Sequence, residues 1–318
     1  MSLNKQLMGN ILMLKILLTP LMFIFHILVR IKNWLYHFGI LKPHKINIPV
    51  ISIGNIAFGG TGKTPLVIDL CNQLKAKGYK PAVISRGYKR KSSGLVVVHN
   101  GQNVHCSVDE SGDEPFLIAK KLVDVPVVVC KKRERAAEYI MKTFSDVNII
   151  LLDDGFQYRK LHRDIDIVLL SGKECNGILR EPKSSLKRAD MTLALDKQYS
   201  VCEFENDKLT PNKPTKGVYA FCGIANPKSF LQYLNDEKIE IKWKTIYNDH
   251  HDYSEKSMTK LKDTINQTGA NSIITTEKDL VKLPTDFLEQ YQIYIVTLST
   301  KFEDDTIYNK IFKGLENL

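Results

Sequence analysis

The sequence predicts an α/β fold in which a mainly parallel sheet is flanked by helices. Short apolar and β-branched runs alternate along the chain with segments of helical spacing, as parallel strands and crossover helices require. Two runs end in polar or glycine-rich segments: Val50–Ile53 leads into clustered glycines, and Val147–Asp154 ends in paired aspartates. The strand–loop–helix order restarts at Val218, which predicts a second, smaller α/β domain.

Residues 1–40 are predicted to form a membrane-associated helix. The stretch 16–29 is apolar apart from Thr19 and His26, and Trp34 and Tyr36 follow it. It is shorter than the ~20 residues that a spanning helix needs. Its basic flanks and aromatic residues are typical of the membrane–water interface. The pattern does not distinguish spanning from interfacial forms, and a hydrophobic helix packed on the protein is the alternative.

The segment from Pro49 to Leu70 has the order of a phosphate-binding loop: strand, glycine loop, Lys-Thr and helix. Glycines allow backbone N–H groups to surround phosphate oxygens, and the helix N-terminus attracts the same anion. The first glycine of the usual pattern is replaced by Ala57. An ordinary glycine-rich turn is the alternative. We expect a P-loop NTPase-like sheet, with phosphate contacts from Gly59, Gly60, Thr61, Gly62, Lys63 and Thr64.

The paired aspartates Asp153 and Asp154 suggest a Mg²⁺ site together with Thr64, because an Asp that ends a neighbouring strand coordinates the metal in such folds. Other polar residues have two interpretations each. The basic loop after residue 85 lies at the carboxyl end of a strand, where α/β sheets bind ligands, but it is equally a solvated loop. Asp113 and Glu114 are also candidate caps of the helix that follows them. His250 lies in a His-Asp cluster that either binds metal or transfers protons, or is a solvated loop without a chemical role.

We expect a phosphate-loop domain over residues 41–202, a linker over 203–216, and a smaller closing domain over 217–318. The linker has two prolines, two asparagines and alternating charges. Lys plus Arg outnumber Asp plus Glu by 45 to 35, a surplus that suits phosphorylated substrates, anionic lipid or nucleic acid. The six cysteines are scattered without zinc spacing, which indicates a reducing compartment.

Seven motifs in register make the chain resemble the tetraacyldisaccharide 4'-kinase family. They are SIGNIAFGGTGKTP, SRGY (85–88), GDEP (112–115), DDGFQ (153–157), LREP (179–182), DHHDY (249–253) and TEKDLVKL (276–283). The resemblance implies an ATP- and Mg²⁺-dependent kinase of lipid A biosynthesis. It would phosphorylate the 4'-hydroxyl of a tetraacyldisaccharide 1-phosphate to form lipid IVA, at the cytoplasmic face of the inner membrane. It implies no nucleic-acid partner, and no obligate protein partner is evident.

The resemblance also implies residue roles. Asp113 and His250 would form a dyad that acts as general base, Lys63 would contact phosphate, and Arg180 would stabilise charge. Further active-site positions are Arg86, Tyr88, Arg133, Gln157 and Glu181. The sequence does not show that Asp113 and His250 are close.

The main rival is a membrane-associated nucleotide-switch ATPase of the partitioning or targeting type. Such proteins carry a signature lysine before the glycines, and here that position is Phe58. A GTPase is disfavoured because the sequence has no Asn-Lys-x-Asp motif. A nucleic-acid-stimulated ATPase should cluster basic and aromatic residues, whereas the basic residues here spread along the whole chain.

Overall fold

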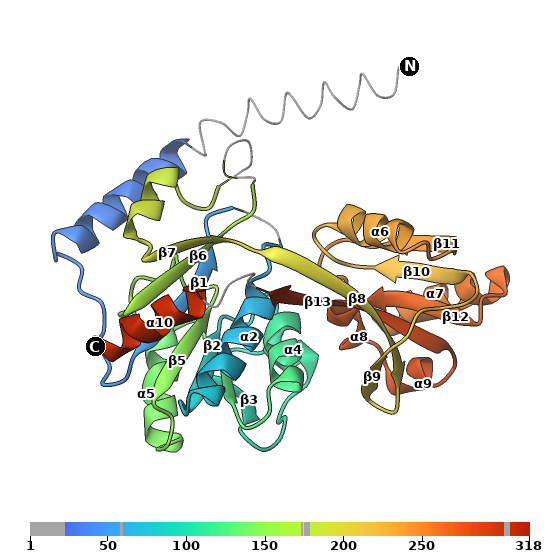
Figure 1. The fold of residues 1–318 in the computed structure, drawn as a ribbon, viewed down its shortest axis with the longest axis horizontal. Coiled ribbons are helices and arrows are strands. Elements are labelled where there is room, and N and C mark those ends of the chain that lie inside the picture. Colours follow the sequence, from blue (N-terminus) through green and yellow to red (C-terminus); the bar gives the residue numbers. More distant parts are fainter. Residues whose placement is uncertain (1–22, 58–59, 173, 175–178, 302–305) are drawn as a thin grey trace.

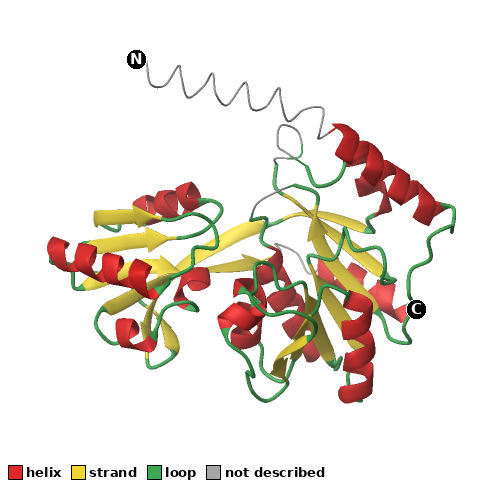
Figure 2. Ribbon diagram, turned by 180° about the vertical axis from the view of Figure 1, so that it is seen from behind, coloured by secondary structure: helices red, strands yellow, loops and turns green. Residues whose placement is uncertain are grey.

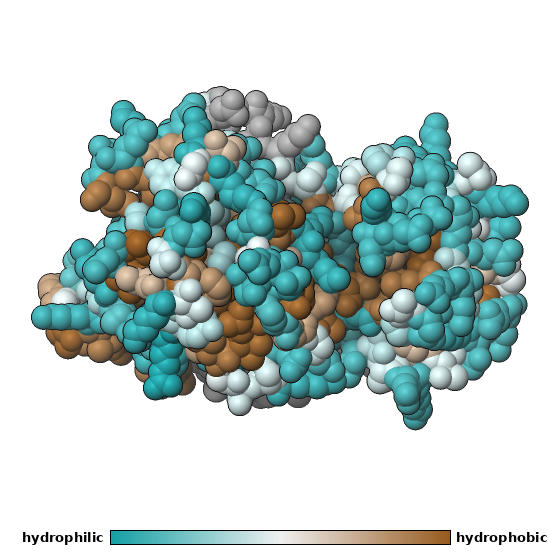
Figure 3. All heavy atoms as spheres, turned by 90° about the horizontal axis from the view of Figure 1, so that it is seen from below, coloured by the Kyte–Doolittle hydropathy of each residue, from teal (hydrophilic) through white to brown (hydrophobic). Residues whose placement is uncertain are grey.

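A computed structural model describes residues 23–57, 60–172, 174, 179–301 and 306–318. The molecule has two lobes, each built around one sheet (Figure 1). The larger lobe contains seven strands and the smaller lobe six. Seen from below, both lobes present mainly hydrophilic residues with smaller apolar patches (Figure 3). Because each lobe combines a mostly parallel sheet with helices, the predicted α/β class is confirmed.

The first sheet has the strand order β3-β4-β2-β5-β1-β6-β7, and only β3 is antiparallel to its neighbour. Its strands are β1 (Val50–Asn55), β2 (Pro81–Ser85), β3 (Val96–Asn100), β4 (Pro126–Val129), β5 (Ile149–Asp153), β6 (Ile165–Leu170) and β7 (Met191–Ala194). Its helical segments are α2 (Lys63–Ala76), α3 (Val108–Ser111), α4 (Asp113–Lys121), α5 (Arg133–Thr143) and the 3₁₀ helix η1 (Lys183–Arg188).

Both faces of this sheet are buried, which explains its continuous apolar strands. Alternate residues of β5 enter different cores: Ile149 and Leu151 pack with α2 and α4, whereas Ile150 and Leu152 pack with α5. Because β1, β2 and β5 are parallel neighbours, their carboxyl ends meet at one edge of the sheet, where Asp153 ends β5 and the phosphate-binding loop follows β1.

The second sheet has the order β11-β10-β12-β13-β8-β9. Its strands are β8 (Asp196–Glu205), β9 (Lys208–Pro211), β10 (Val218–Cys222), β11 (Ile241–Ile246), β12 (Ser272–Thr276) and β13 (Gln292–Lys301). Strands β10 to β13 are parallel, and β8 and β9 extend the sheet in antiparallel fashion. The helices are α6 (Pro227–Asp236), α7 (Glu255–Thr268), α8 (Glu277–Leu280) and α9 (Thr285–Leu288).

The domain boundaries differ from those expected. The segment expected as a linker, 203–216, contains the end of β8, the turn and β9, which form a hairpin in which Phe204 is opposite Leu209. The chain crosses between the lobes directly after β7, and it returns after β13 to α10 (Thr306–Glu316). Tyr308 and Ile311 of α10 are buried in the core of the first lobe. The hairpin was not expected because exposed edge strands carry charges and proline, as linkers do.

The N-terminal helix is described from residue 23 and runs to residue 37 along one edge of the larger lobe (Figure 2). Polar contacts hold one of its sides: Asn33 Nδ2 lies 3.3 Å from Ser185 Oγ, and His26 Nε2 lies 3.2 Å from the Leu179 carbonyl oxygen. Its apolar side chains Ile24, Leu28 and others remain exposed. In the part of the chain that is described, no helix combines the length and apolar character needed to cross a membrane.

Candidate active site

The phosphate-binding loop leads into α2 as the sequence predicts. Gly62 has a φ of 91°, a conformation that favours glycine, and α2 begins at the next residue. Lys63 Nζ donates a hydrogen bond to Asn55 Oδ1 at 3.2 Å and lies 3.3 Å from Asp154 Oδ1. Thr61 and Thr64 are buried beside it. Phe58 and Gly59 lie outside the described residues.

The two aspartates at the end of β5 have different environments. Asp153 is buried, and its Oδ2 accepts a hydrogen bond from Ser85 Oγ at 2.9 Å. Asp154 has a φ of 53° and turns toward Lys63 and Arg180, whose Nη1 lies 3.0 and 2.8 Å from its two oxygens. The predicted phosphate, metal and charge-stabilising residues therefore form one cluster.

These environments move the two carboxyl pKa values apart. Burial, followed by the charges of Glu114 and Asp154, raises the pKa of Asp153 to about 7. Burial would also raise the pKa of Asp154, but Lys63 and Arg180 outweigh it and hold that pKa below its usual value. At Asp153 the charge of Lys63 is outweighed by burial and by the neighbouring carboxylates.

The cluster fits a magnesium ion that binds together with a nucleotide. Asp153 Oδ1 is buried and has no hydrogen-bond partner among the described residues. The same part of the chain has no group of three His, Cys, Asp or Glu side chains arranged as a metal site. Mg²⁺ typically takes one or two carboxylates and completes its shell with water and phosphate oxygens. Thr64, Asp153 and Asp154 provide hydroxyl and carboxylate oxygens of that kind.

The second cluster brings the two lobes together. Asp113 is the first residue of α4, and His250 lies in the loop between β11 and α7. His250 Nδ1 lies 3.0 Å from Asp113 Oδ2, so the expected proximity of these residues is confirmed. His250 has a φ of 59°, and its N–H donates to the Gly223 carbonyl oxygen at 3.1 Å. The Tyr88 ring contacts the imidazole edge-on, with centroids 5.3 Å apart.

The family model described as "Tetraacyldisaccharide-1-P 4'-kinase" matches residues 14–316. The chain belongs to the tetraacyldisaccharide 4'-kinase family. The relative from Halothermothrix orenii is 33% identical over 84% of this chain and 83% of its own length. The relative from Desulfotalea psychrophila is 32% identical over 90% and 93%.

A solved structure of this family has the same fold. The crystal structure of LpxK from Aquifex aeolicus, described as an "apo" form in complex with ATP, superposes with a TM-score of 0.79 at 31% sequence identity. The match covers 95% of this chain and 99% of the other. The two-lobed arrangement is therefore that of a tetraacyldisaccharide 4'-kinase.

Lys282 lies beside the Asp113–His250 pair. Its Nζ lies 3.3 Å from Asp113 Oδ2 and 3.4 Å from Asp279 Oδ1. Burial would raise the pKa of Asp113, but the hydrogen bond with His250 and the charge of Lys282 hold it below its usual value. Asp279 also accepts hydrogen bonds from Tyr253 Oη and the Gly223 N–H, both at 3.0 Å. It thereby fixes the loop that carries His250.

An ion pair between the lobes joins the two clusters. Lys278 Nζ lies 2.8 Å from Glu114 Oε1, next to Asp113. The charge of Lys278 lowers the pKa of Glu114 despite burial, and Glu114 in turn outweighs burial to raise the pKa of Lys278 to about 12. The sequence suggested only helix capping for Glu114 and no role for Lys278 or Lys282, although all three lie within the quoted motifs.

The remaining predicted positions have different surroundings. Gln157 Nε2 donates to the Asn55 carbonyl oxygen at 2.8 Å, and so supports the residue that holds Lys63. Arg133 is buried with its guanidinium 4.4 Å from the Tyr158 ring centroid, and burial lowers its pKa. Arg86 and Tyr88 are exposed at the carboxyl end of β2.

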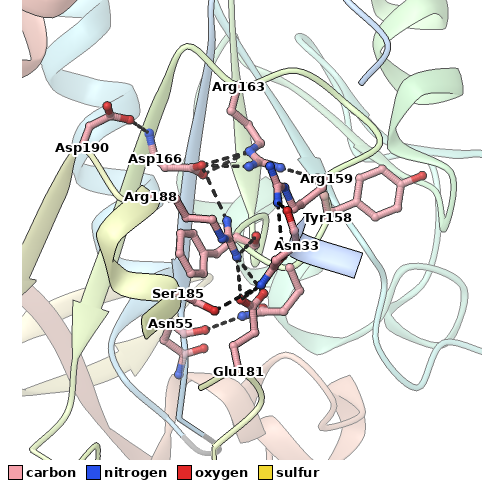
Figure 4. Close-up of polar contacts among 12 residues, drawn as sticks. Asn33, Asn55, Tyr158, Arg159, Arg163, Asp166, Glu181, Ser185, Arg188 and Asp190 are labelled. Carbon is pink, nitrogen blue, oxygen red and sulfur yellow. Dashed lines mark hydrogen bonds and ion pairs between the residues drawn. The ribbon is translucent and has the colours of Figure 1, made fainter. Parts of the chain in front are cut away.

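Glu181 belongs to a third, separate network. Its carboxylate receives two contacts from Arg188 Nη2, at 2.7 and 2.8 Å, and lies near Asn33 Nδ2 of the N-terminal helix (Figure 4). Glu181 therefore connects the helix to η1, and its described contacts do not include the Lys63 or His250 clusters.

Proposed function

We propose that this chain transfers the γ-phosphoryl group of ATP to the 4'-hydroxyl of a tetraacyldisaccharide 1-phosphate and forms lipid IVA. The observation that carries this proposal is the Asp113–His250 pair, which joins the two lobes beside the Lys63 cluster in a chain of this kinase family. A nucleotide switch needs no general base, whereas a kinase that acts on a sugar hydroxyl uses one.

His250 would remove the proton of the acceptor hydroxyl. Because the pKa of Asp113 lies below its usual value, its carboxylate would accept a hydrogen bond from Nδ1–H, which would place the free electron pair of the ring on Nε2, 3.7 Å from Asp249 Oδ2. Asp113 would orient the ring and stabilise the imidazolium that forms as the O–P bond develops. Lys282 and the Gly223 carbonyl fix the positions of Asp113 and His250.

Lys63 and Arg180 would stabilise charge on the transferred phosphoryl group, because both cations already converge on one carboxylate, Asp154. Mg²⁺ bound with ATP would be held by Thr64, Asp153 and Asp154 and would offset the negative charge of the phosphates. The ion pair between Glu114 and Lys278 holds the lobes together around this space and would help to exclude water.

The decisive test follows label from γ-labelled ATP in mixed detergent micelles. The purified full chain with Mg²⁺ should label a tetraacyldisaccharide 1-phosphate, and turnover should require that acceptor. Membrane-stimulated ATP hydrolysis without transfer to the disaccharide would instead support the nucleotide-switch alternative. The Lys63→Ala variant provides the background.

The exposed face of the N-terminal helix supports membrane association, and we place the enzyme at the cytoplasmic face of the inner membrane as part of this proposal. Ile24, Leu28 and Ile31 follow i, i+4, i+7 spacing and are 54%, 59% and 50% exposed. Replacing all three with serine should reduce flotation with phosphatidylethanolamine–phosphatidylglycerol vesicles at least about tenfold, because their burial in lipid is lost.

A matched variant replaces three exposed apolar residues elsewhere, Val123, Leu209 and Leu318, with serine. Its flotation should equal that of the wild type. Equal flotation of both triple variants would show that the helix face does not contact lipid.

A further inference from the structure

A basic pocket of about 420 Å³ lies between the N-terminal helix and η1. Four cationic side chains line it: Arg30, Arg159, Lys187 and Arg188. The hydroxyl groups of Ser184 and Ser185 and the half-exposed Trp34 ring complete the part of the lining that matters here. No role is assigned to this pocket by the proposed phosphoryl transfer.

Two of the arginines are held in fixed positions. Arg159 Nη1 donates to the Asn33 carbonyl oxygen at 3.1 Å, and its guanidinium lies 4.6 Å from the Tyr36 ring centroid. Arg188 stacks 3.5 Å from the Phe156 ring centroid while its Nη2 binds Glu181 (Figure 4). The Nε and Nη1 atoms of Arg188 are buried and have no hydrogen-bond partner among the described residues. Arg188 is thus an oriented guanidinium of the pocket lining whose Nε and Nη1 make no hydrogen bond with a described residue, although its Nη1 lies 3.9 Å from Asp166 Oδ2.

The other two cations are exposed, and no ion pair involves Arg30 or Lys187 in the described part of the chain. Positive charge exceeds negative charge around the pocket, because Glu181 is the carboxylate bound to Arg188 and Asp166 is mainly paired with Arg163. Burial and neighbouring arginines lower the pKa of Lys32, although Glu181 opposes this. An anion placed here would relieve this repulsion.

We propose that this pocket binds a phosphate group carried by a lipid. Fixed arginines and serine hydroxyls are the donors that recognise phosphate oxygens. The occupant is lipid-borne because the pocket is built on the helix whose apolar face is exposed, and Trp34 belongs to both. In the chain, the pocket-lining residue Pro182 follows two residues after Arg180, which binds Asp154.

Two lipids could supply this phosphate: the 1-phosphate of the disaccharide acceptor, an assignment that rests on the proposed function, or an anionic phospholipid headgroup. The test uses the full chain with Arg30→Ala and Lys187→Ala combined, since both residues are exposed and their loss should leave the fold intact. The charge-matched control combines Lys42→Ala and Lys45→Ala, which are exposed lysines outside the pocket lining.

Two measurements distinguish the sources. The first is KM in neutral detergent micelles for the tetraacyldisaccharide with and without its 1-phosphate. The second is flotation with phosphatidylcholine vesicles that contain or lack phosphatidic acid. If the acceptor supplies the phosphate, the pocket variant raises KM about tenfold for the 1-phosphate compound only. If a phospholipid supplies it, flotation with the acidic vesicles falls by a similar factor and KM does not change.

The proposal is overturned if the pocket variant matches the Lys42→Ala/Lys45→Ala control in both measurements, because diffuse surface charge would then explain any effect. Failure of the wild type to phosphorylate the disaccharide would reject the proposed function, yet the vesicle measurement would still test the pocket. The two failures are therefore distinguishable.

Discussion

Replacing His250 with alanine is expected to lower kcat by about 10²–10⁴-fold and to leave ATP binding nearly unchanged. The imidazole would take the proton of the acceptor hydroxyl, and its Nδ1 lies 3.0 Å from Asp113 Oδ2. ATP would bind at the Lys63 cluster, whose described contacts do not involve His250. Steady-state kinetics with both substrates varied, together with nucleotide binding to the variant, separate the two effects.

His250→Asn is the second variant, because asparagine tolerates the positive φ of this position and should keep the loop conformation. We expect kcat to fall about as far in Asp113→Ala as in His250→Ala. The double variant should show the same fall in kcat, since the two residues act as one unit. His105→Ala removes an exposed histidine of the first lobe and should have no effect. Wild-type kcat in both His250 variants, or losses that multiply in the double variant, would contradict a dyad.

Local patterns were sufficient to predict the two strands of the first lobe that carry the site, β1 and β5. The run from Val147 to Asp154 is apolar at consecutive positions because both faces of β5 are buried, and its aspartates emerge where the strand leaves the core. The loop before α2 needs Gly62 at a positive φ, so its residue types also reveal its shape. Such features depend on neighbours in the sequence.

Contacts between distant segments could not be predicted in the same way. The helix α10 was not among the predicted elements, and nothing in residues 306–316 specifies that it packs on the first lobe rather than the second. The proximity of Asp113 and His250 was implied by family resemblance alone, and 137 positions separate them. Lys278 and Lys282 look like surface lysines in sequence, and only their partners across the lobes reveal their role.

Glu181 shows a further limit of motif reasoning. It lies beside Arg180 in the same motif, yet Arg180 turns toward Asp154 and Glu181 turns toward Arg188. Neighbouring residues of this irregular segment contact different partners, so one motif contributes to two sites. The predicted active-site position of Glu181 remains a prediction, and its observed contacts link it to the basic pocket instead.

Replacing Lys63 with alanine should lower turnover by about 10²–10³-fold, because it removes a buried cation from the position where charge develops on the phosphoryl group. ATP affinity should fall as well, by about tenfold, since the ammonium would also contact the bound phosphates. The side chain is 10% exposed and its Nζ is already fixed between Asn55 and Asp154, which orients it before any nucleotide arrives. Phosphoryl transfer and direct nucleotide binding, measured at equal protein stability, report the two losses.

Lys142→Ala is the matched control, because this exposed lysine of α5 carries the same charge in the same lobe and should retain full activity. Lys63→Arg tests geometry separately from charge: the larger guanidinium should not fit the narrow space beside Asp154, so this variant should remain impaired. Full turnover in Lys63→Ala would falsify the phosphate-loop assignment. If Lys63→Arg has full turnover while Lys63→Ala does not, the positive charge near Asp154 matters and the position of the ammonium does not.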